Sequence, residues 1–186
     1  MRASLFTVAV LAGTIFSAYG CSQGSLPTTP TSTPSVTASV SSSVAVTSEV
    51  DAYVPFKGTL QGTDTDTDRT PSTVVVTTEG LGNGTLLGRF SFTQRVTLSF
   101  ATSTTTGVAH WVAANGDNID TTVAGSGHRT GTPGEIEITD VHIITGGTGR
   151  FARTHGSFTV QRLASAITFT TAGSYDGTIA SPGAAR

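Results

Sequence analysis

The side chains best suited to acid–base chemistry in this 186-residue sequence are an aspartate and histidines on predicted strands. Asp140 and His142 stand two residues apart within the segment 135–145, so a strand there projects both from the face that carries Ile136 and Ile138. His110 shares the parity of the valines around it. If these faces line one lumen, the three residues form a polar centre that can exchange protons with a bound ligand. The alternative places them near the rim or outside.

Two further sets of charged residues could contact ligands. Arg89 and Arg95 share the polar face of one predicted strand and could meet an anionic ligand, although a solvated strand face is the simpler interpretation. Asp64, Asp66 and Asp68 alternate with threonines and offer the oxygen ligands that calcium prefers. Their segment lacks the glycine and the distal glutamate of a helical calcium loop, so a solvated acidic loop is favoured.

No motif in the sequence predicts a metal or cofactor. The segment 147–152 fits a loose dinucleotide-binding pattern, but that pattern needs a following helix, and residues 156–160 have the character of a strand. We therefore expect a structural turn and no cofactor. Zinc ligands occur at characteristic spacings, which the scattered histidines do not show. The four histidines are His110, His128, His142 and His155.

The N-terminus has the layout of an export signal. A positive charge at Arg2 precedes the apolar run Leu5–Phe16, which is shorter than the roughly 20 residues needed to span a bilayer. This pattern is typical of a cleavable signal peptide, which we assign to residues 1–20.

The cysteine that follows, Cys21, is the only one in the sequence. A lone thiol is unusual in an exported protein. Its position directly after the apolar run resembles a bacterial lipobox, which implies a lipidated Cys21, a membrane anchor and a cell-envelope location. Lipoboxes usually carry an aliphatic residue and a small residue where Ala18 and Tyr19 stand here. A secreted or periplasmic protein is therefore the alternative.

Residues 21–48 are expected to be a tether. The stretch Ser22–Ser48 contains nine Ser, six Thr and three Pro, with no charged or aromatic residue. Such a composition buries too little apolar surface to offset the entropy lost on ordering. We predict a flexible linker that holds the domain of residues 49–186 away from its anchor.

That domain is predicted to be all-β. Apolar and polar residues alternate between glycine-rich punctuation, and no window shows a helical stripe. The strongest hairpin signal is Asn115-Gly116. Eight consecutive strands with short links favour an up-and-down antiparallel barrel, with a two-sheet sandwich as the alternative. The expected strands are 53–61, 73–78, 85–100, 107–114, 118–125, 135–145, 155–163 and 166–179, with a loop at 62–71 and turns at 80–84 and 146–149.

Three short segments carry a family resemblance. The turn Asn115-Gly116-Asp117, the run from Ile143 to Ala152 with its Gly-Thr-Gly-Arg-Phe turn, and the strand beginning Gly156-Ser157-Phe158-Thr159 occur in this order. Together they resemble the allene oxide cyclase-like and dirigent-like barrel proteins, including bacterial members, over about residues 55–179. The resemblance implies an eight-stranded barrel with a lumen. It transfers no catalytic residue to this sequence.

Charge and composition narrow the function classes. The net charge of −2 gives no electrostatic footprint for nucleic acid. We expect a non-enzymatic barrel that binds a small apolar ligand or acts as an envelope interaction module. One alternative is an isomerase or cyclase acting on a lipid-like or phenolic substrate. Another is a structural or adhesive surface protein. The sequence leaves the oligomeric state open.

Overall fold

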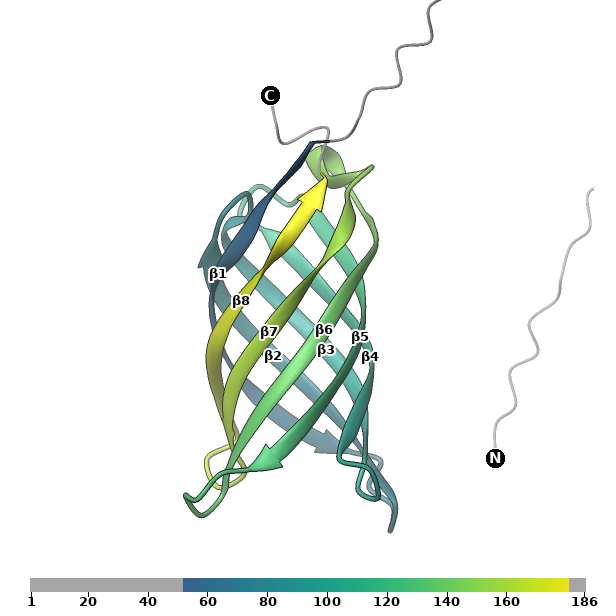
Figure 1. Cartoon of the computed structure of the whole chain (residues 1–186), viewed down its shortest axis with the longest axis vertical. Coiled ribbons are helices and arrows are strands. Elements are labelled where there is room, and N and C mark those ends of the chain that lie inside the picture. The colour runs from purple at the N-terminus through teal and green to yellow at the C-terminus, as the bar shows by residue number, and fades with distance from the viewer. Residues whose placement is uncertain (1–51, 181–186) are drawn as a thin grey trace, which may run out of the picture. The chain divides into compact units, whose positions relative to one another are not determined.

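The computed structural model describes residues 52–180. The predicted signal peptide and the whole predicted tether, including the anchor residue Cys21, lie outside the described residues. Within them, every strand pairs with its sequence neighbours, and the last strand closes onto the first (Figure 1). The closed eight-stranded antiparallel barrel predicted from the sequence is thereby confirmed, and the two-sheet sandwich is excluded.

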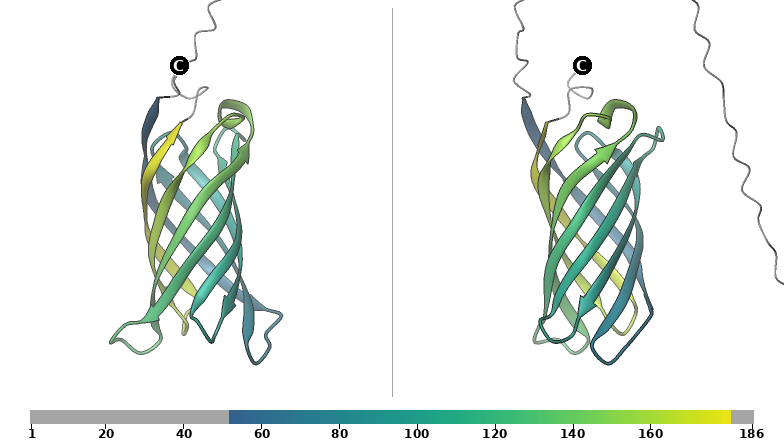
Figure 2. Two further views of the ribbon diagram at one scale, coloured as in Figure 1. Left: turned by 45° about the vertical axis from the view of Figure 1, so that its right-hand side comes forward. Right: turned by 90° about the vertical axis from the view of Figure 1, so that its right-hand side faces the viewer.

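The strands are tilted around the barrel axis, as the two rotated views in Figure 2 show. They follow in chain order and are joined by short loops. Their bounds are β1 Tyr53–Thr67, β2 Thr73–Gly84, β3 Gly88–Ser99, β4 Thr104–Ala113, β5 Asn118–Arg129, β6 Glu135–Gly147, β7 His155–Ser165 and β8 Thr170–Ala180. A short 3-10 helix, η1, spans Gly149–Phe151 between β6 and β7. Among residues 52–180 there is no helix long and apolar enough to cross a membrane.

Alternation along β3 shows why these sequences form a barrel. Phe90, Phe92 and Val96 are buried inside, whereas Arg89 and Arg95 are exposed outside. Successive side chains of a strand project to opposite faces, so one parity fills the lumen and the other meets solvent. Closure of the sheet also removes the unpaired edges that an open sheet would expose.

Two predicted breaks are strand in the structure, the first in part and the second in full. The polar segment 62–71 was expected to be a loop, but β1 continues through Thr67. The glycine-rich segment 80–84 was expected to be a turn, but it forms the second half of β2. Gly80 lies opposite Phe92 and Gly82 opposite Phe90, and a Cβ at either glycine would be within 2.5 Å of the facing ring. The glycines therefore make room for aromatic rings inside the barrel.

One end of the barrel is closed by packed aromatic side chains. Trp111 lies at the centre, with ring centroids 5.3 Å from Phe90, Phe92 and Phe158. The η1 turn covers this end (top in Figure 1) and inserts Phe151, which is fully buried. We call this the closed end. The core that fills it comprises Phe56, Leu87, Phe90, Phe92, Trp111, Ile119, Phe151, Phe158, Tyr175 and Ile179.

The two turns that carry the family resemblance meet at the closed end. Arg150 of η1 donates its backbone N–H to the Asp117 carboxylate, and its guanidinium lies 3.6 Å from the same group. Gly149 has a φ of +55° and lies against this carboxylate, where a side chain would clash. The β4–β5 hairpin and the Gly-Thr-Gly-Arg-Phe turn are thus one structural unit, with a packing role.

Candidate functional site

The other end of the barrel, the open end, contains a cavity of about 840 Å³. It is enclosed by the barrel strands, just inside the loops that join β1 to β2, β3 to β4, β5 to β6, and β7 to β8. Its volume is within the range of roughly 300–1,000 Å³ found for small-molecule sites. Most of its lining surface is apolar, with aromatic residues near the mouth. The apolar lining residues include Val74, Val76, Val96, Leu98, Phe100, Ile136, Ile138, Ala164 and Phe169.

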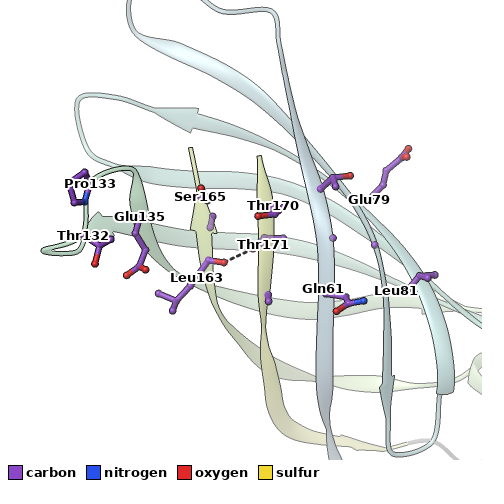
Figure 3. A pocket seen from close by; sticks show the side chains of 15 residues that line it. Gln61, Glu79, Leu81, Thr132, Pro133, Glu135, Leu163, Ser165, Thr170 and Thr171 are labelled. Atoms are coloured by element: carbon purple, nitrogen blue, oxygen red, sulfur yellow. Dashed lines mark hydrogen bonds between the residues drawn. The ribbon is translucent and has the colours of Figure 1, made fainter. Parts of the chain in front are cut away.

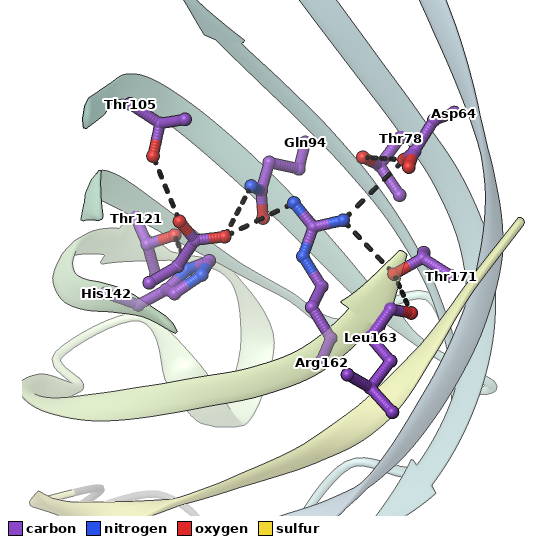
Figure 4. Close-up of polar contacts among 10 residues, drawn as sticks. Asp64, Thr78, Gln94, Thr105, Thr121, His142, Arg162, Leu163 and Thr171 are labelled. Carbon is purple, nitrogen blue, oxygen red and sulfur yellow. Dashed lines mark hydrogen bonds and ion pairs between the residues drawn. The ribbon is translucent and has the colours of Figure 1, made fainter. Parts of the chain in front are cut away.

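A buried charged pair lies where the cavity meets the aromatic core. Asp140 on β6 is fully buried, and its Oδ2 is 3.3 Å from an Arg162 guanidinium nitrogen on β7 (Figure 4). Gln94 donates to the same oxygen at 3.0 Å, and the Thr105 hydroxyl donates to Oδ1 at 3.1 Å. Three donors, one of them the cationic Arg162, therefore hold this carboxylate, which is the condition for burying a charge.

Arg162 links this pair to a second carboxylate. Its other terminal nitrogen is 3.6 Å from Asp64 Oδ1 and 3.3 Å from the Thr171 hydroxyl. Asp64 also accepts a short hydrogen bond of 2.6 Å from Thr78. Arg162, Asp64 and Thr105 line the cavity, whereas Asp140 lies behind them. The floor cluster, as we name it, comprises Asp64, Gln94, Thr105, Asp140, Arg162 and Thr171.

His142 lies on the far side of Asp140, within the aromatic core. Its ring stacks on Phe158 at a centroid distance of 4.8 Å, and Nδ1 is 3.0 Å from the Thr121 hydroxyl. Desolvation lowers the pKa of His142 from 6.5 to about 4; Asp140 opposes this shift and Arg162 adds to it. The imidazole is therefore neutral at neutral pH. Because it does not line the cavity, it cannot exchange protons directly with a ligand there.

This histidine makes stability dependent on pH. Its pKa is lower in the folded state than the 6.5 of an unperturbed histidine, so the unfolded chain binds more protons between about pH 6.5 and pH 4. The stability gained by burying His142 in its neutral form is therefore present above this pH window and is lost as the pH falls through it. Between pH 7 and pH 5 we expect His142 to lower the free energy of unfolding by about 2 kcal/mol. Urea unfolding measures the loss, which should be absent from His142→Gln; an equal loss in both proteins would contradict the assignment.

The structure separates the three residues proposed as an acid–base centre. Asp140 and His142 both lie inside the barrel, but His110 projects outside, where its Nδ1 is 2.6 Å from Asp120 Oδ1. The prediction that His110 faces the lumen is wrong, because the neighbouring valines used as its reference also face outward. Val108 is 58% exposed, whereas Trp111, of the opposite parity, is 1% exposed.

The remaining predicted site residues are dispersed. Arg89 and Arg95 lie on the outer face of β3, away from the cavity, and Arg95 is 3.6 Å from Asp68. Asp66 pairs with Arg69 at 2.8 Å, while Asp64 turns inward to the floor cluster. The three aspartates therefore have different partners. No group of three or more potential metal ligands converges within residues 52–180, and His128 and His155 belong to no such group.

Sequence reasoning missed the residue that organises the floor cluster. Arg162 shares the parity of Phe158 and Val160, so its inward position was readable from the alternation on β7. Gln94 likewise stands between Phe92 and Val96 on the inward face of β3. A polar residue at an inward position of a barrel strand is thus the signal that identifies this cluster.

A second hollow lies on the outer wall near the open end (Figure 3). It has a volume of about 650 Å³ and passes over outward side chains of β1, β2, β7 and β8, between Leu81 and Leu163. Both leucines are exposed. Apart from Glu79 and Glu135, its lining residues carry no charge.

The fold and the site together define a closed antiparallel barrel with one packed end and one hollow end. No family model and no curated protein matches the chain. Among solved structures, it is similar to the pterocarpan synthase dirigent protein GePTS1, with a TM-score of 0.50 and 14% sequence identity. The match covers 76% of this chain and 98% of that chain. At this identity the likeness shows a dirigent-like barrel fold.

Proposed function

We propose that the protein binds a small, largely apolar ligand in the open-end cavity, as a binding module that performs no reaction on it. The observation that carries this proposal is the cavity of about 840 Å³ above a buried polar floor. Aliphatic walls supply affinity through burial of apolar surface, and a few fixed polar groups orient the ligand. A phenolic ligand meets these requirements, and the dirigent-like fold supports that choice.

The floor cluster favours binding over proton transfer. Asp140 is enclosed by Gln94, Thr105 and Arg162, and it does not line the cavity. His142 is separated from the cavity as well. Of the two carboxylates of the floor cluster, Asp64 is the one that lines the cavity, and its contacts with Thr78 and Arg162 both use Oδ1. Its second carboxylate oxygen can accept a hydrogen bond from a ligand hydroxyl.

A second candidate is an isomerase or cyclase on a lipid-like or phenolic substrate. The observation that favours it is the position of Asp64 and Arg162 at the edge of an apolar cavity, where a carboxylate and a cation can act on one substrate. The two candidates predict different fates for the ligand. A ligand recovered unchanged after prolonged incubation supports the binding module, whereas conversion that Asp64→Asn abolishes supports the enzyme.

A matched pair of substitutions tests the location of binding. Ala164 points into the cavity, and Ala172, on the neighbouring strand, points outward. Thermal shift with a lipid and phenolic panel should identify ligands that stabilise the protein. We expect Ala164→Phe to weaken their binding at least tenfold by filling the cavity, and Ala172→Phe to leave it unchanged. If no ligand stabilises the protein and native mass spectrometry finds it empty, the proposal fails.

We further propose that the barrel is exported and anchored through Cys21. Support comes from the apolar run Leu5–Phe16, the position of Cys21 and the Ser/Thr/Pro composition after it. Metabolic labelling with a fatty-acid analogue tests the anchor. Label that Cys21→Ala removes supports a lipoprotein, and unlabelled protein in the medium supports secretion instead.

A further inference from the structure

We propose that the ligand is a hydroxy acid, bound with a neutral hydroxyl on the floor cluster and an anionic carboxylate at the mouth. This inference rests on the proposed binding function and adds the chemical nature and direction of the ligand. It follows from an uneven distribution of charge between the two ends of the cavity, with an apolar wall between them.

The floor is net negative. Asp64 and Asp140 provide two carboxylates, and Arg162 provides the single cation between them. Arg162 is 4% exposed, so water screens this excess charge poorly. Asp64 Oδ2, for which no described residue is a partner, is a hydrogen-bond acceptor beside the cavity. A hydroxyl can donate to it, whereas a carboxylate placed there would meet a like charge and have no proton to donate.

Arg162 does not offer an alternative site for an anion. One terminal nitrogen contacts Asp140, and the other contacts Asp64 and Thr171. Both terminal nitrogens are therefore already used within the protein, and the remaining donor, Nε–H, is buried away from solvent. An incoming carboxylate would have to displace Asp64, which would leave that aspartate with only its hydrogen bond from Thr78.

The mouth has the opposite character. Arg129, near the end of β5, lines the cavity and has no ion pair with any residue in the range 52–180. The other arginine of the mouth, Arg69, is compensated by Asp66 and lies over the Phe100 ring at 5.3 Å. The uncompensated charge at the mouth is therefore positive and partly solvated, which suits an anionic group that remains in contact with water.

The wall between these two ends fixes the shape of the ligand. Aliphatic side chains separate the floor from the mouth, and they include Val76, Val96 and Ile138. Polar atoms in the middle of the ligand would lose hydrogen bonds to water without replacement. An apolar body with one polar group at each end satisfies all three regions.

Three probes with one apolar body test the inference: ω-hydroxydodecanoic acid, dodecanol and dodecanoic acid. Isothermal calorimetry on the purified full chain should give the hydroxy acid about tenfold tighter binding than dodecanoic acid, because the latter lacks the donor for Asp64. Against dodecanol the advantage should be about threefold, since the carboxylate meets Arg129 in partly exposed surroundings.

Two substitutions assign each preference to its residue. Arg129→Gln should remove only the advantage of the hydroxy acid over dodecanol. Asp64→Asn should remove only its advantage over dodecanoic acid. Circular dichroism checks that both variants fold. Arg89→Gln, on the outer wall, is the matched control and should change neither. Equal affinities for all three probes, or preferences that survive both substitutions, overturn the hydroxy-acid inference and leave ligand binding intact. Absence of binding by every probe, together with an unresponsive lipid and phenolic panel, overturns the proposed function itself.

Discussion

Replacing Arg162 by Met is expected to lower the free energy of unfolding by about 3–5 kcal/mol. Arg162 is 4% exposed and Asp140 is 0% exposed, so the substitution leaves a carboxylate in the interior without its cation. Gln94 and Thr105 still donate to that carboxylate, but neutral donors do not replace a full positive charge. Urea unfolding of the variant and the parent at pH 7 measures the difference.

The matched control removes the charge from both partners. In Arg162→Met/Asp140→Asn, the asparagine carbonyl can still accept a hydrogen bond from Gln94 or Thr105, and no buried charge remains beside it. We expect this double variant to be more stable than Arg162→Met alone, because breaking a buried pair costs more than replacing both partners. If the double variant is instead destabilised by the sum of the two single changes, the pair does not act as a unit, and our account of the floor cluster is wrong.

The contrast between His142 and His110 shows how far parity predicts a barrel interior. On β6 the reference residues were isoleucines, and the aspartate and histidine of the same parity do lie inside. On β4 the reference residues were valines, which are common on both faces of a strand. The single tryptophan, Trp111, has the opposite parity to His110 and was the better indicator, because burial of a large aromatic side chain is worth far more than burial of a valine.

The sequence predicts only part of the floor cluster, and the reason differs from that for His110. Alternation gives the face on which a side chain lies, but not its depth along the barrel axis or its neighbours across the lumen. Asp64, Asp140 and Arg162 lie on β1, β6 and β7, and their contacts depend on the register between strands. The irregularity between Asp120 and Thr121 in the β5–β6 pairing, where Thr145 has no opposite residue, is a shift of this kind. Such shifts have no reliable local sequence signal.

The glycines of β2 predict a turn from the sequence alone, because a glycine cluster within a strand has the local character of a turn. The structure supplies a reason that the sequence shows only in hindsight. Gly80 and Gly82 are two residues apart, as are Phe90 and Phe92, and the β2–β3 register places each glycine opposite a phenylalanine. A glycine pair and an aromatic pair at equal spacing on either side of a short turn therefore indicate a strand whose missing side chains admit the opposite rings.

This interpretation predicts that Gly82→Ala lowers the free energy of unfolding by about 3 kcal/mol, at the upper end of the cost of overpacking a core. The new Cβ would clash with the Phe90 ring and lie 2.5 Å from the Thr59 backbone oxygen, so no single rotamer change relieves both contacts. Gly146→Ala is the matched control, because a Cβ added there would meet no atom within 4 Å. It should change the free energy of unfolding by less than about 0.5 kcal/mol. If the two variants unfold at the same urea concentration, the glycines of β2 are not there to admit the rings.

Phe90→Leu in the Gly82→Ala background separates the two contacts, because it relieves the ring clash and leaves the backbone clash. We expect it to restore only part of the lost stability, since the closely paired β1 backbone cannot move away.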